Sequence, residues 1–125
     1  MYMNRLTVIG FLGADGETKF TRNGNAFTTL SIATKRSWKD AEGAWASRTE
    51  WHRSLVFGKL GEFAALLKKG THVQIEGELR SREYEKDGVK HRVWECIADS
   101  ILKLDRAERQ ESTPEDQPVD DHVPA

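Results

Sequence analysis

Hydrophobic and polar residues alternate along most of the chain with the period of two that is typical of β-strands. Gly, Asn and Asp residues, which favour turns, separate one alternating stretch from the next. A first turn begins near Gly13, and residues 18–20 continue the strand that it interrupts. The pattern therefore predicts strands over residues 5–13, 25–36, 49–59, 71–84 and 91–104.

One stretch of the chain changes from the period of a strand to the period of a helix. Leu60, Phe63, Ala64 and Leu67 follow the i, i+3, i+4, i+7 spacing of one helical face. Gly70 follows this stretch, and glycine is common just past the C-terminus of a helix. The sequence thus predicts one short helix between the third and the fourth strand.

The predicted elements are strands except for this helix, so the expected fold class is all-β. Five strands with one short helix between the third and the fourth is the arrangement of the OB-fold, a partly open Greek-key barrel that binds oligonucleotides and oligosaccharides. A small antiparallel α+β sandwich would show a similar pattern. We predict a five-stranded OB-fold barrel, with the sandwich as the alternative.

A shift in composition divides the chain near its C-terminus. Residues 1–106 hold 18 Lys or Arg against 14 Asp or Glu, whereas residues 107–125 hold six acidic residues against Arg109 alone. The second segment also contains all three prolines and few apolar residues, so it cannot offset the entropy cost of ordering itself. We predict one OB-fold domain over residues 1–106 and a disordered acidic tail over residues 107–125.

Several classes of function find no support in the sequence. No apolar run is long enough to cross a bilayer and the N-terminus lacks a signal-peptide pattern, so we expect a cytoplasmic protein without membrane partners. Cys96 is the only cysteine, which we expect to be buried, and the four histidines are scattered, so we expect no disulfide, metal site or cofactor. Ser54 follows His52 by two residues, but no nucleophile-elbow motif surrounds it. The sequence favours a binding protein rather than an enzyme.

Aromatic residues stand beside basic residues in segments that should be partly exposed. Trp51 and Phe57 occupy alternate positions of the third strand with Arg53 between them, so all three lie on one face. Bases stack on exposed rings whatever their identity, while Lys and Arg contact the phosphates. A sequence-tolerant binder of single strands needs this mixture, although Trp51 and Phe57 could equally belong to the core. The other aromatic candidates are Trp38, Trp45 in the loop that follows it, and Tyr84 near Arg80 and Arg82.

Apolar residues occur on both faces of the first predicted strand. Leu6 and Val8 would point to one face of the strand, whereas Ile9 and Phe11 would point to the other. A single small barrel needs only one apolar face, so the surplus predicts self-association of symmetric copies through residues such as Ile9. A bulge at Gly10, which would switch the face partway along the strand, is the alternative explanation.

Four segments together resemble the bacterial single-stranded DNA-binding protein family. They are SWKD, TEWHRSLVFGKL, LLKKGTHVQIEGELRSREY and WECIADSI, and their order and spacing match the family over residues 3–104. The resemblance implies an OB-fold that assembles into a homotetramer. It also implies binding of single-stranded DNA in replication, recombination and repair.

The resemblance assigns roles to individual residues. Trp38, Trp51 and Phe57 match base-stacking positions of the family. Tyr84 matches an aromatic position that also contacts DNA, although the family often has Trp there. His52 matches a histidine near the subunit interface, which implies a structural role. The basic residues that we expect to contact the DNA backbone are Lys35, Arg36, Arg53, Lys59, Arg80 and Arg82.

Two features depart from the family pattern. The family's tail ends in several Asp, an apolar residue, Pro and a terminal Phe, through which proteins of DNA metabolism dock, whereas this chain ends in DDHVPA. The resemblance therefore does not carry partner recruitment over to this tail, and a phage or mobile-element origin fits as well as a place at the bacterial nucleoid. Glu83, Glu85 and Asp87 also make one hairpin more acidic than a phosphate groove requires.

A second hypothesis comes from the same fold. An OB-fold whose strands mainly form oligomers could serve as a protein-interaction module of a replication-restart complex, as in the related primosomal proteins. Such a module has no need of stacking platforms. The presence of Trp38, Trp51, Phe57 and Tyr84 therefore favours DNA binding.

Overall fold

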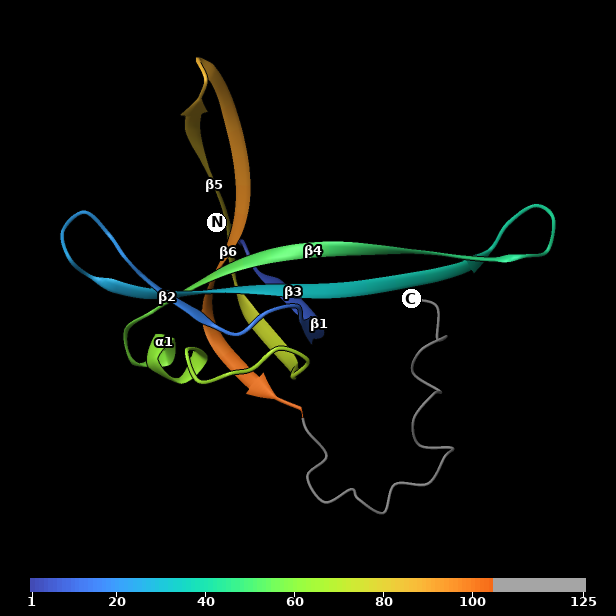
Figure 1. Cartoon of the computed structure of the whole chain (residues 1–125), viewed down its shortest axis with the longest axis horizontal. Helices are drawn as coiled ribbons and strands as arrows, with labels where there is room; N and C mark the ends of the chain where they lie inside the picture. The colour runs from blue at the N-terminus through green and yellow to red at the C-terminus, as the bar shows by residue number, and fades with distance from the viewer. Residues whose placement is uncertain (105–125) are drawn as a thin grey trace.

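Strands account for most of the residues that the computed structural model describes, which are residues 1–104. The alternating stretches are rich in β-branched and aromatic residues, which suit a pleated, half-buried surface. One short helix interrupts them (Figure 1). The elements are β1 (Leu6–Leu12), β2 (Glu17–Phe20), β3 (Ala26–Lys39), β4 (Trp45–Phe57), α1 (Gly58–Ala64), β5 (His72–Lys86) and β6 (Val89–Lys103).

The strands form one sheet that closes into a barrel. Its order is β1-β5-β6-β4-β3-β2, and β1 also pairs with β3, so the sheet closes on itself. Both β1 and β2 pair with β3, so they act as two halves of one strand with a break between them, as the sequence predicted. Counted in this way, the fold is a closed five-stranded barrel with one helix between β4 and β5. The predicted OB-fold is confirmed, and the sandwich alternative is wrong.

The first strand keeps a regular alternation along its whole length. On β1, every second residue from Val8 to Leu12 is buried. The pairing of β1 with β5 runs without a register shift, so no bulge switches the face at Gly10. Ile9 and Phe11 consequently lie outside and are exposed. The second apolar face of this strand is a true outer surface, and the bulge explanation is wrong.

The core consists of small and branched side chains. Val56, Val73 and Ile75 are completely buried. Cys96 is buried as expected, and this burial raises the pKa of its thiol above the ordinary value of 9.0. The buried hydrophobic cluster comprises Val8, Leu12, Leu30, Ile32, Val56, Ala64, Leu67, Val73, Ile75, Cys96 and Ala98.

The helix is shorter than its hydrophobic pattern predicts. It ends at Ala64. Ala65 still donates to the carbonyl of Gly61, four residues back, but Leu66 and Leu67 donate to carbonyls only three residues back, those of Phe63 and Ala64. Such bonds wind the chain more tightly than an α-helix does. Leu67 is still buried although it lies outside the helix, whereas Phe63, which the pattern placed in the core, is exposed.

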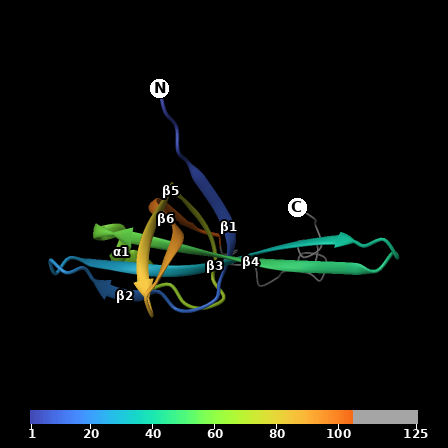
Figure 2. The same ribbon diagram turned by 90° about the horizontal axis from the view of Figure 1, so that it is seen from above.

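Two hairpins extend beyond the barrel, as Figure 1 and Figure 2 show from two directions. β3 and β4 pair out to Lys39 opposite Trp45, and β5 and β6 pair out to Lys86 opposite Val89. The β3–β4 hairpin is longer than predicted, and its tight turn is held by Asp40, whose carboxylate accepts hydrogen bonds from two backbone N–H groups. Trp45 was expected in a loop, but it is the first residue of β4.

The predictions for the C-terminus lie outside the described residues. The domain boundary at residue 106 and the disorder of residues 107–125 therefore stay predictions. Within residues 1–104, no helix is long and apolar enough to cross a membrane.

Candidate nucleic-acid interface

Trp51, Arg53 and Phe57 lie together on the outer face of β4, as the sequence predicted. The residues that alternate with them, Ser54 and Val56, point into the barrel and are buried. Trp51 and Phe57 are 59% and 43% exposed. The alternative, that these rings belong to the core, is wrong.

A groove opens beside Phe57. Phe27 lies directly opposite Phe57 on β3, and the two ring centroids are 5.3 Å apart. Both rings line a groove of about 750 Å³, together with polar residues that include Asn25, Lys59 and Glu62. A base can stack against such a ring pair while a lysine meets its phosphate. The predicted contact Lys59 is therefore placed beside Phe57.

The Trp51 ring rests on the backbone of Gly13. A Cβ atom at Gly13 would lie 2.4 Å from Cζ3 and 2.7 Å from Cη2 of Trp51. Gly13 itself is held in place, because its N–H donates to the carbonyl of Ser31 at 2.9 Å. The missing side chain at residue 13 thus allows the ring to lie close to the barrel.

We expect Gly13→Ala to displace the Trp51 ring without unfolding the barrel. The added methyl group would meet an exposed side chain, which moves more easily than backbone. The loss of one stacking geometry should weaken oligo(dT) binding about 5-fold or more, measured by fluorescence anisotropy. In a Trp51→Ala background the same change should have little effect. An equal loss in both backgrounds would contradict this role of Gly13.

Arg53 and Arg82 bind one buried carboxylate. Glu95 is only 3% exposed, and it accepts hydrogen bonds from Nε of Arg53 at 2.7 Å and from Nε and Nη2 of Arg82 at 3.1 and 3.2 Å. Burial tends to raise the pKa of Glu95, but the hydrogen bonds from Arg82 and Arg53 outweigh it and hold this pKa below the ordinary value of 4.5. Glu95 is therefore ionised at neutral pH, and it joins β4 to the β5–β6 hairpin.

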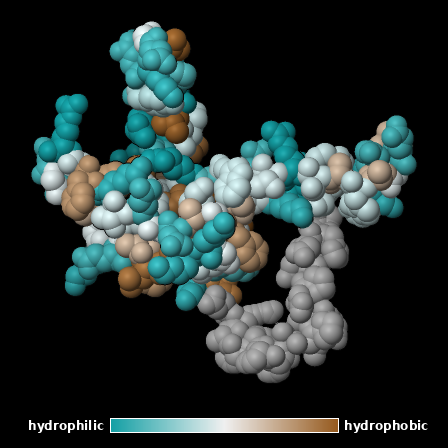
Figure 3. Space-filling view, viewed as in Figure 1, coloured by the Kyte–Doolittle hydropathy of each residue, from teal (hydrophilic) through white to brown (hydrophobic). Residues whose placement is uncertain are grey.

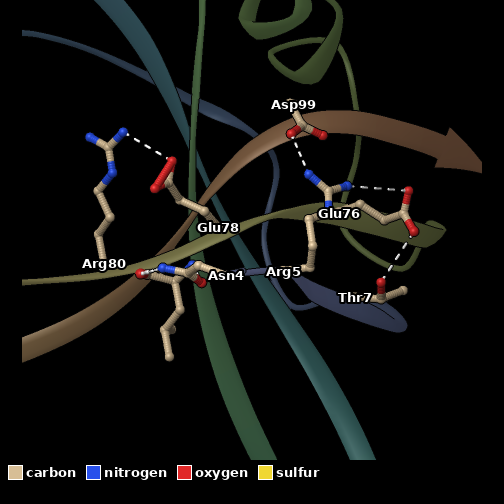
Figure 4. A network of polar contacts seen from close by, with 8 residues as sticks. Asn4, Arg5, Thr7, Glu76, Glu78, Arg80 and Asp99 are labelled. Carbon is tan, nitrogen blue, oxygen red and sulfur yellow. Dashed lines mark hydrogen bonds and ion pairs between the residues drawn. The ribbon is translucent and has the colours of Figure 1, made fainter. Parts of the chain in front are cut away.

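Tyr84 and two arginines share one face of the β5–β6 hairpin. Arg80, Arg82 and Tyr84 alternate along β5 and therefore point to the same side. Tyr84 stacks on His91 of β6, with ring centroids 5.1 Å apart. Arg80 forms an ion pair with Glu78 at 3.1 Å (Figure 4). This face adjoins the outer face of β4, because β4 and β6 pair with each other.

The acidic residues of this hairpin are partly neutralised. Glu83 forms an ion pair with Arg92 at 2.9 Å, and Arg92 also donates to the hydroxyl of Ser81. Figure 3 shows mainly hydrophilic residues on the β5–β6 hairpin, and a mixture of hydrophilic and intermediate residues on the β3–β4 hairpin, on the side in view. The hairpins therefore offer polar surfaces with separate exposed rings rather than a continuous apolar patch.

Trp38 and Arg36 lie on the other face of the β3–β4 hairpin. Side chains alternate along β3, so Arg36 and Trp38 point to the side opposite to Ala33. Ala33 is the cross-strand partner of Trp51. Together with Arg48 and other residues they line a second groove, of about 590 Å³. The structure therefore does not place Trp38 on the same surface as Trp51.

Lys35 and Trp45 lie on the face of Trp51, farther out along the hairpin. Trp45 is 61% exposed, and the ammonium group of Lys39 lies 5.7 Å from its ring centroid. Lys39 is also the cross-strand partner of Trp45. This pair brings an aromatic ring and a positive charge together near the tip.

The two residues predicted at a subunit interface lie on opposite faces of the sheet. Ile9 is on the outer face of β1, in one row with Gln74 of β5 and the exposed Leu102 of β6. His52 is on the inner face of β4, where its Nε2 lies 2.8 Å from Oγ1 of Thr34. Only Ile9 is thus part of this exposed row, whose apolar members are Ile9 and Leu102.

Comparison with known proteins decides the family. A sequence model of the single-strand binding protein family matches residues 3–104. This chain belongs to that family. The single-stranded DNA-binding proteins of Xanthomonas campestris pv. campestris and of Neisseria meningitidis serogroup A are 44% identical over 104 residues and 39% identical over 106 residues. The matches cover 82% and 83% of this chain but only 60% and 61% of those relatives, so the chain spans about 60% of their length.

Two solved structures resemble this member of the single-strand binding protein family. The structure of Plasmodium falciparum SSB in complex with ssDNA has a TM-score of 0.74 and 26% sequence identity, covering 84% of this chain and 97% of that chain. A deletion mutant of the single-stranded DNA binding protein from Thermus aquaticus has a TM-score of 0.70 and 30% identity, covering 83% of this chain and 51% of that one.

Some features of the candidate interface were missed by the sequence analysis. Phe27 could have been found, because it lies opposite Phe57 once β3 and β4 are paired. Trp94 is 56% exposed, on the face of β6 opposite to that of His91. Nothing in the sequence indicated that Glu95 is buried, because its burial depends on the contact between β4 and β6.

Proposed function

We propose that this protein binds single-stranded DNA without sequence preference and protects it during replication, recombination and repair. The observation that supports the proposal is the outer surface of β4 and the adjoining hairpin, where large exposed rings lie beside guanidinium groups held by Glu95. The role is binding rather than catalysis. The proposed contact residues are Trp38, Trp45, Trp51, Phe57, Tyr84, Lys35, Arg36, Arg53, Lys59, Arg80 and Arg82.

Stacking and charge contribute to binding in different ways. Each base stacked on a ring contributes roughly 1 to 3 kcal/mol, and every base has a π-face, so the sequence of the strand matters little. Each phosphate that meets Lys or Arg releases counterions, so affinity falls as salt rises. Because Trp38 and Trp51 lie on opposite faces, a strand that contacts both has to pass around the β3–β4 hairpin.

The emission of the tryptophans tests the proposal. Three of the four lie in the proposed contact set, so oligo(dT) should change their emission as bases stack on them. The complex should also co-migrate on a native gel at low salt. Unchanged emission at micromolar protein, without co-migration, would contradict single-strand binding.

We also propose that the protein is a homo-oligomer, most simply a tetramer. The exposed apolar row of Ile9 and Leu102 lies on the outer face of β1, β5 and β6. On the same β1–β5–β6 side, Arg5 pairs with Asp99 at 2.8 Å and with Glu76 at 3.8 Å (Figure 4). An apolar surface bordered by polar groups is typical of an interface between copies.

Ile9→Glu is expected to dissociate the oligomer. A charge in the apolar row would be buried without a partner if two copies met there, which is costly. Light scattering should show a mass at least about 2-fold lower than that of the wild type if the assembly is symmetric. Phe20→Glu is the matched control, because Phe20 is an exposed apolar residue on β2, away from the row. An unchanged mass of the Ile9 variant would exclude this row as the interface.

Partner docking through the acidic tail and a location in the bacterial cytoplasm stay predictions. The tail lies outside residues 1–104. The relatives from Xanthomonas and Neisseria are bacterial proteins, which supports a role with bacterial, phage or mobile-element DNA.

A further inference from the structure

Glu95 is a buried carboxylate with two cationic partners on different elements. Arg53 reaches it from β4 and Arg82 from β5, while Glu95 itself lies on β6. The side chains of Arg53 and Arg82 remain 39% and 51% exposed, although the carboxylate between them is buried. This triad of Arg53, Glu95 and Arg82 is therefore a fixed link between the strand that carries Trp51 and the hairpin that carries Tyr84.

Each guanidinium group of the triad keeps N–H groups for another ligand. Arg53 donates to Glu95 through Nε alone, and Arg82 donates through Nε and Nη2. Among residues 1–104, the two terminal nitrogens of Arg53 and Nη1 of Arg82 have no hydrogen-bond acceptor. A guanidinium presents five N–H groups in a planar fork that fits phosphate oxygens. The free N–H groups are thus available at an exposed surface.

The triad also keeps a positive charge, because two guanidinium groups face one carboxylate. A free arginine side chain loses rotamer entropy when it binds a ligand, whereas a side chain already held in place loses less. Glu95 therefore has two opposite effects on an anionic ligand. Its charge weakens the attraction, and its hydrogen bonds prepare the donors.

We propose that Glu95 is a positioning residue for single-strand binding, which holds Arg53 and Arg82 so that their free N–H groups meet phosphates of the strand. The inference rests on the proposed function, because the ligand is the same strand that stacks on the neighbouring rings. It assigns a favourable role to an acidic residue in a basic surface. From its charge alone, Glu95 would be expected to weaken the binding of an anionic strand.

Glu95→Gln separates the two effects by the sign of the change. The variant gains one unit of positive charge, so charge alone predicts tighter binding of oligo(dT). Positioning predicts that binding becomes about tenfold weaker, the factor expected when one charge-assisted hydrogen bond is lost. It also predicts that the slope of log affinity against log salt becomes less steep by about 0.7 for each phosphate that the variant no longer binds. A merely structural role would lower the unfolding temperature and leave this slope unchanged.

Glu83→Gln is the matched control. Glu83 lies on β5 and pairs at 2.9 Å with Arg92, which is outside the proposed contact set, and its side chain is 51% exposed. The change in charge is the same as in Glu95→Gln, without loss of a buried acceptor. Positioning predicts that this control binds oligo(dT) as tightly as the wild type or slightly more tightly.

Glu95→Asp is a second test that does not change the charge. The side chain is one methylene shorter, so it cannot keep the same bonds to both Arg53 and Arg82. Positioning predicts several-fold weaker binding, whereas charge alone predicts no change. Circular dichroism and light scattering establish that each variant has the fold and mass of the wild type, and Glu95→Asp decides if Glu95→Gln does not fold.

The outcomes separate this inference from the proposed function. Wild-type binding together with weaker binding by both Glu95 variants supports the positioning role. If the wild type binds and the folded Glu95 variants bind as tightly or more tightly, the positioning role is overturned while single-strand binding stands. If the wild type does not bind oligo(dT), the proposed function itself fails.

Discussion

Replacing Trp51 by Ala is expected to weaken the binding of oligo(dT) by roughly 5- to 150-fold, which corresponds to one lost stack of 1 to 3 kcal/mol. The ring is exposed on the outer face of β4, so its loss removes a platform for a base without opening a cavity in the core. Phe57→Ala should act in the same range, because Phe57 lies on the same face and lines the groove beside Phe27. Fluorescence anisotropy with labelled oligo(dT) measures both variants.

Phe20→Ala is the matched control for the change at Phe57. Phe20 is an exposed Phe as well, but it pairs with Ala26, the neighbour of Phe27, and so lies on the other face of the sheet. Its affinity should stay within about 2-fold of the wild type, because a surface substitution away from the site has little effect. Light scattering should give the wild-type mass for all three variants. If Trp51→Ala and Phe57→Ala lowered the mass and left DNA affinity intact, the protein-interaction module would be the better account.

Gly77→Ala is expected to destabilise the barrel by more than about 3 kcal/mol. A Cβ atom at Gly77 would lie 2.0 Å from the carbonyl oxygen of Ile97 and 2.8 Å from Cα of Ala98. Both atoms belong to the backbone of β6, next to the bulge of the β5–β6 pair, so paired strands would have to move apart. Thermal unfolding should occur at least about 10 °C lower than in the wild type.

Gly24→Ala is the matched comparison, because it adds a methyl group where no neighbouring atom would clash with it. No atom lies within 4 Å of a Cβ at Gly24, but its φ of +88° is left-handed, so alanine there should cost about 1 to 2 kcal/mol. Gly77→Ala should therefore be the more destabilised of the two. Equal unfolding temperatures of the two variants would mean that β6 moves aside at little cost.

The strands of the barrel could be predicted from the sequence because each has one buried face. β1 alternates buried and exposed residues from Val8 to Leu12, and such alternation is visible in the sequence. The outer parts of the hairpins could not be predicted in this way. Around Trp38 and Trp45 both faces are exposed, so no hydrophobic period marks the strand, and polar residues there looked like a loop.

The helix, in contrast, was predicted to be longer than it is. Leu67 continues the spacing of Leu60 and Ala64, so the pattern predicted a helix that includes it. Leu67 is indeed buried, but the chain reaches that position through a tighter turn after Ala64. The periodic pattern correctly indicated that Leu67 is buried, but it does not distinguish an α-helix from a turn that leads to the same place.

The candidate site was predictable where it depends on one strand. The spacing of Trp51, Arg53 and Phe57 was enough to place them on one face, and the structure agrees. The opposite placement of Trp38 depends on the register between β3 and β4, and the triad depends on contacts between residues 42 and 13 positions apart. Such long-range contacts leave no local pattern in the sequence.

Competition between single strands and a duplex tests the central claim most directly. The whole chain should bind labelled oligo(dT) and oligo(dA) of equal length with similar affinity, since stacking accepts every base, and binding should weaken as salt rises. The matching dA·dT duplex hides its base faces, so it should compete at least about tenfold less well than either single strand. Equal competition by the duplex, or binding limited to one base sequence, would contradict the account of stacking on exposed rings.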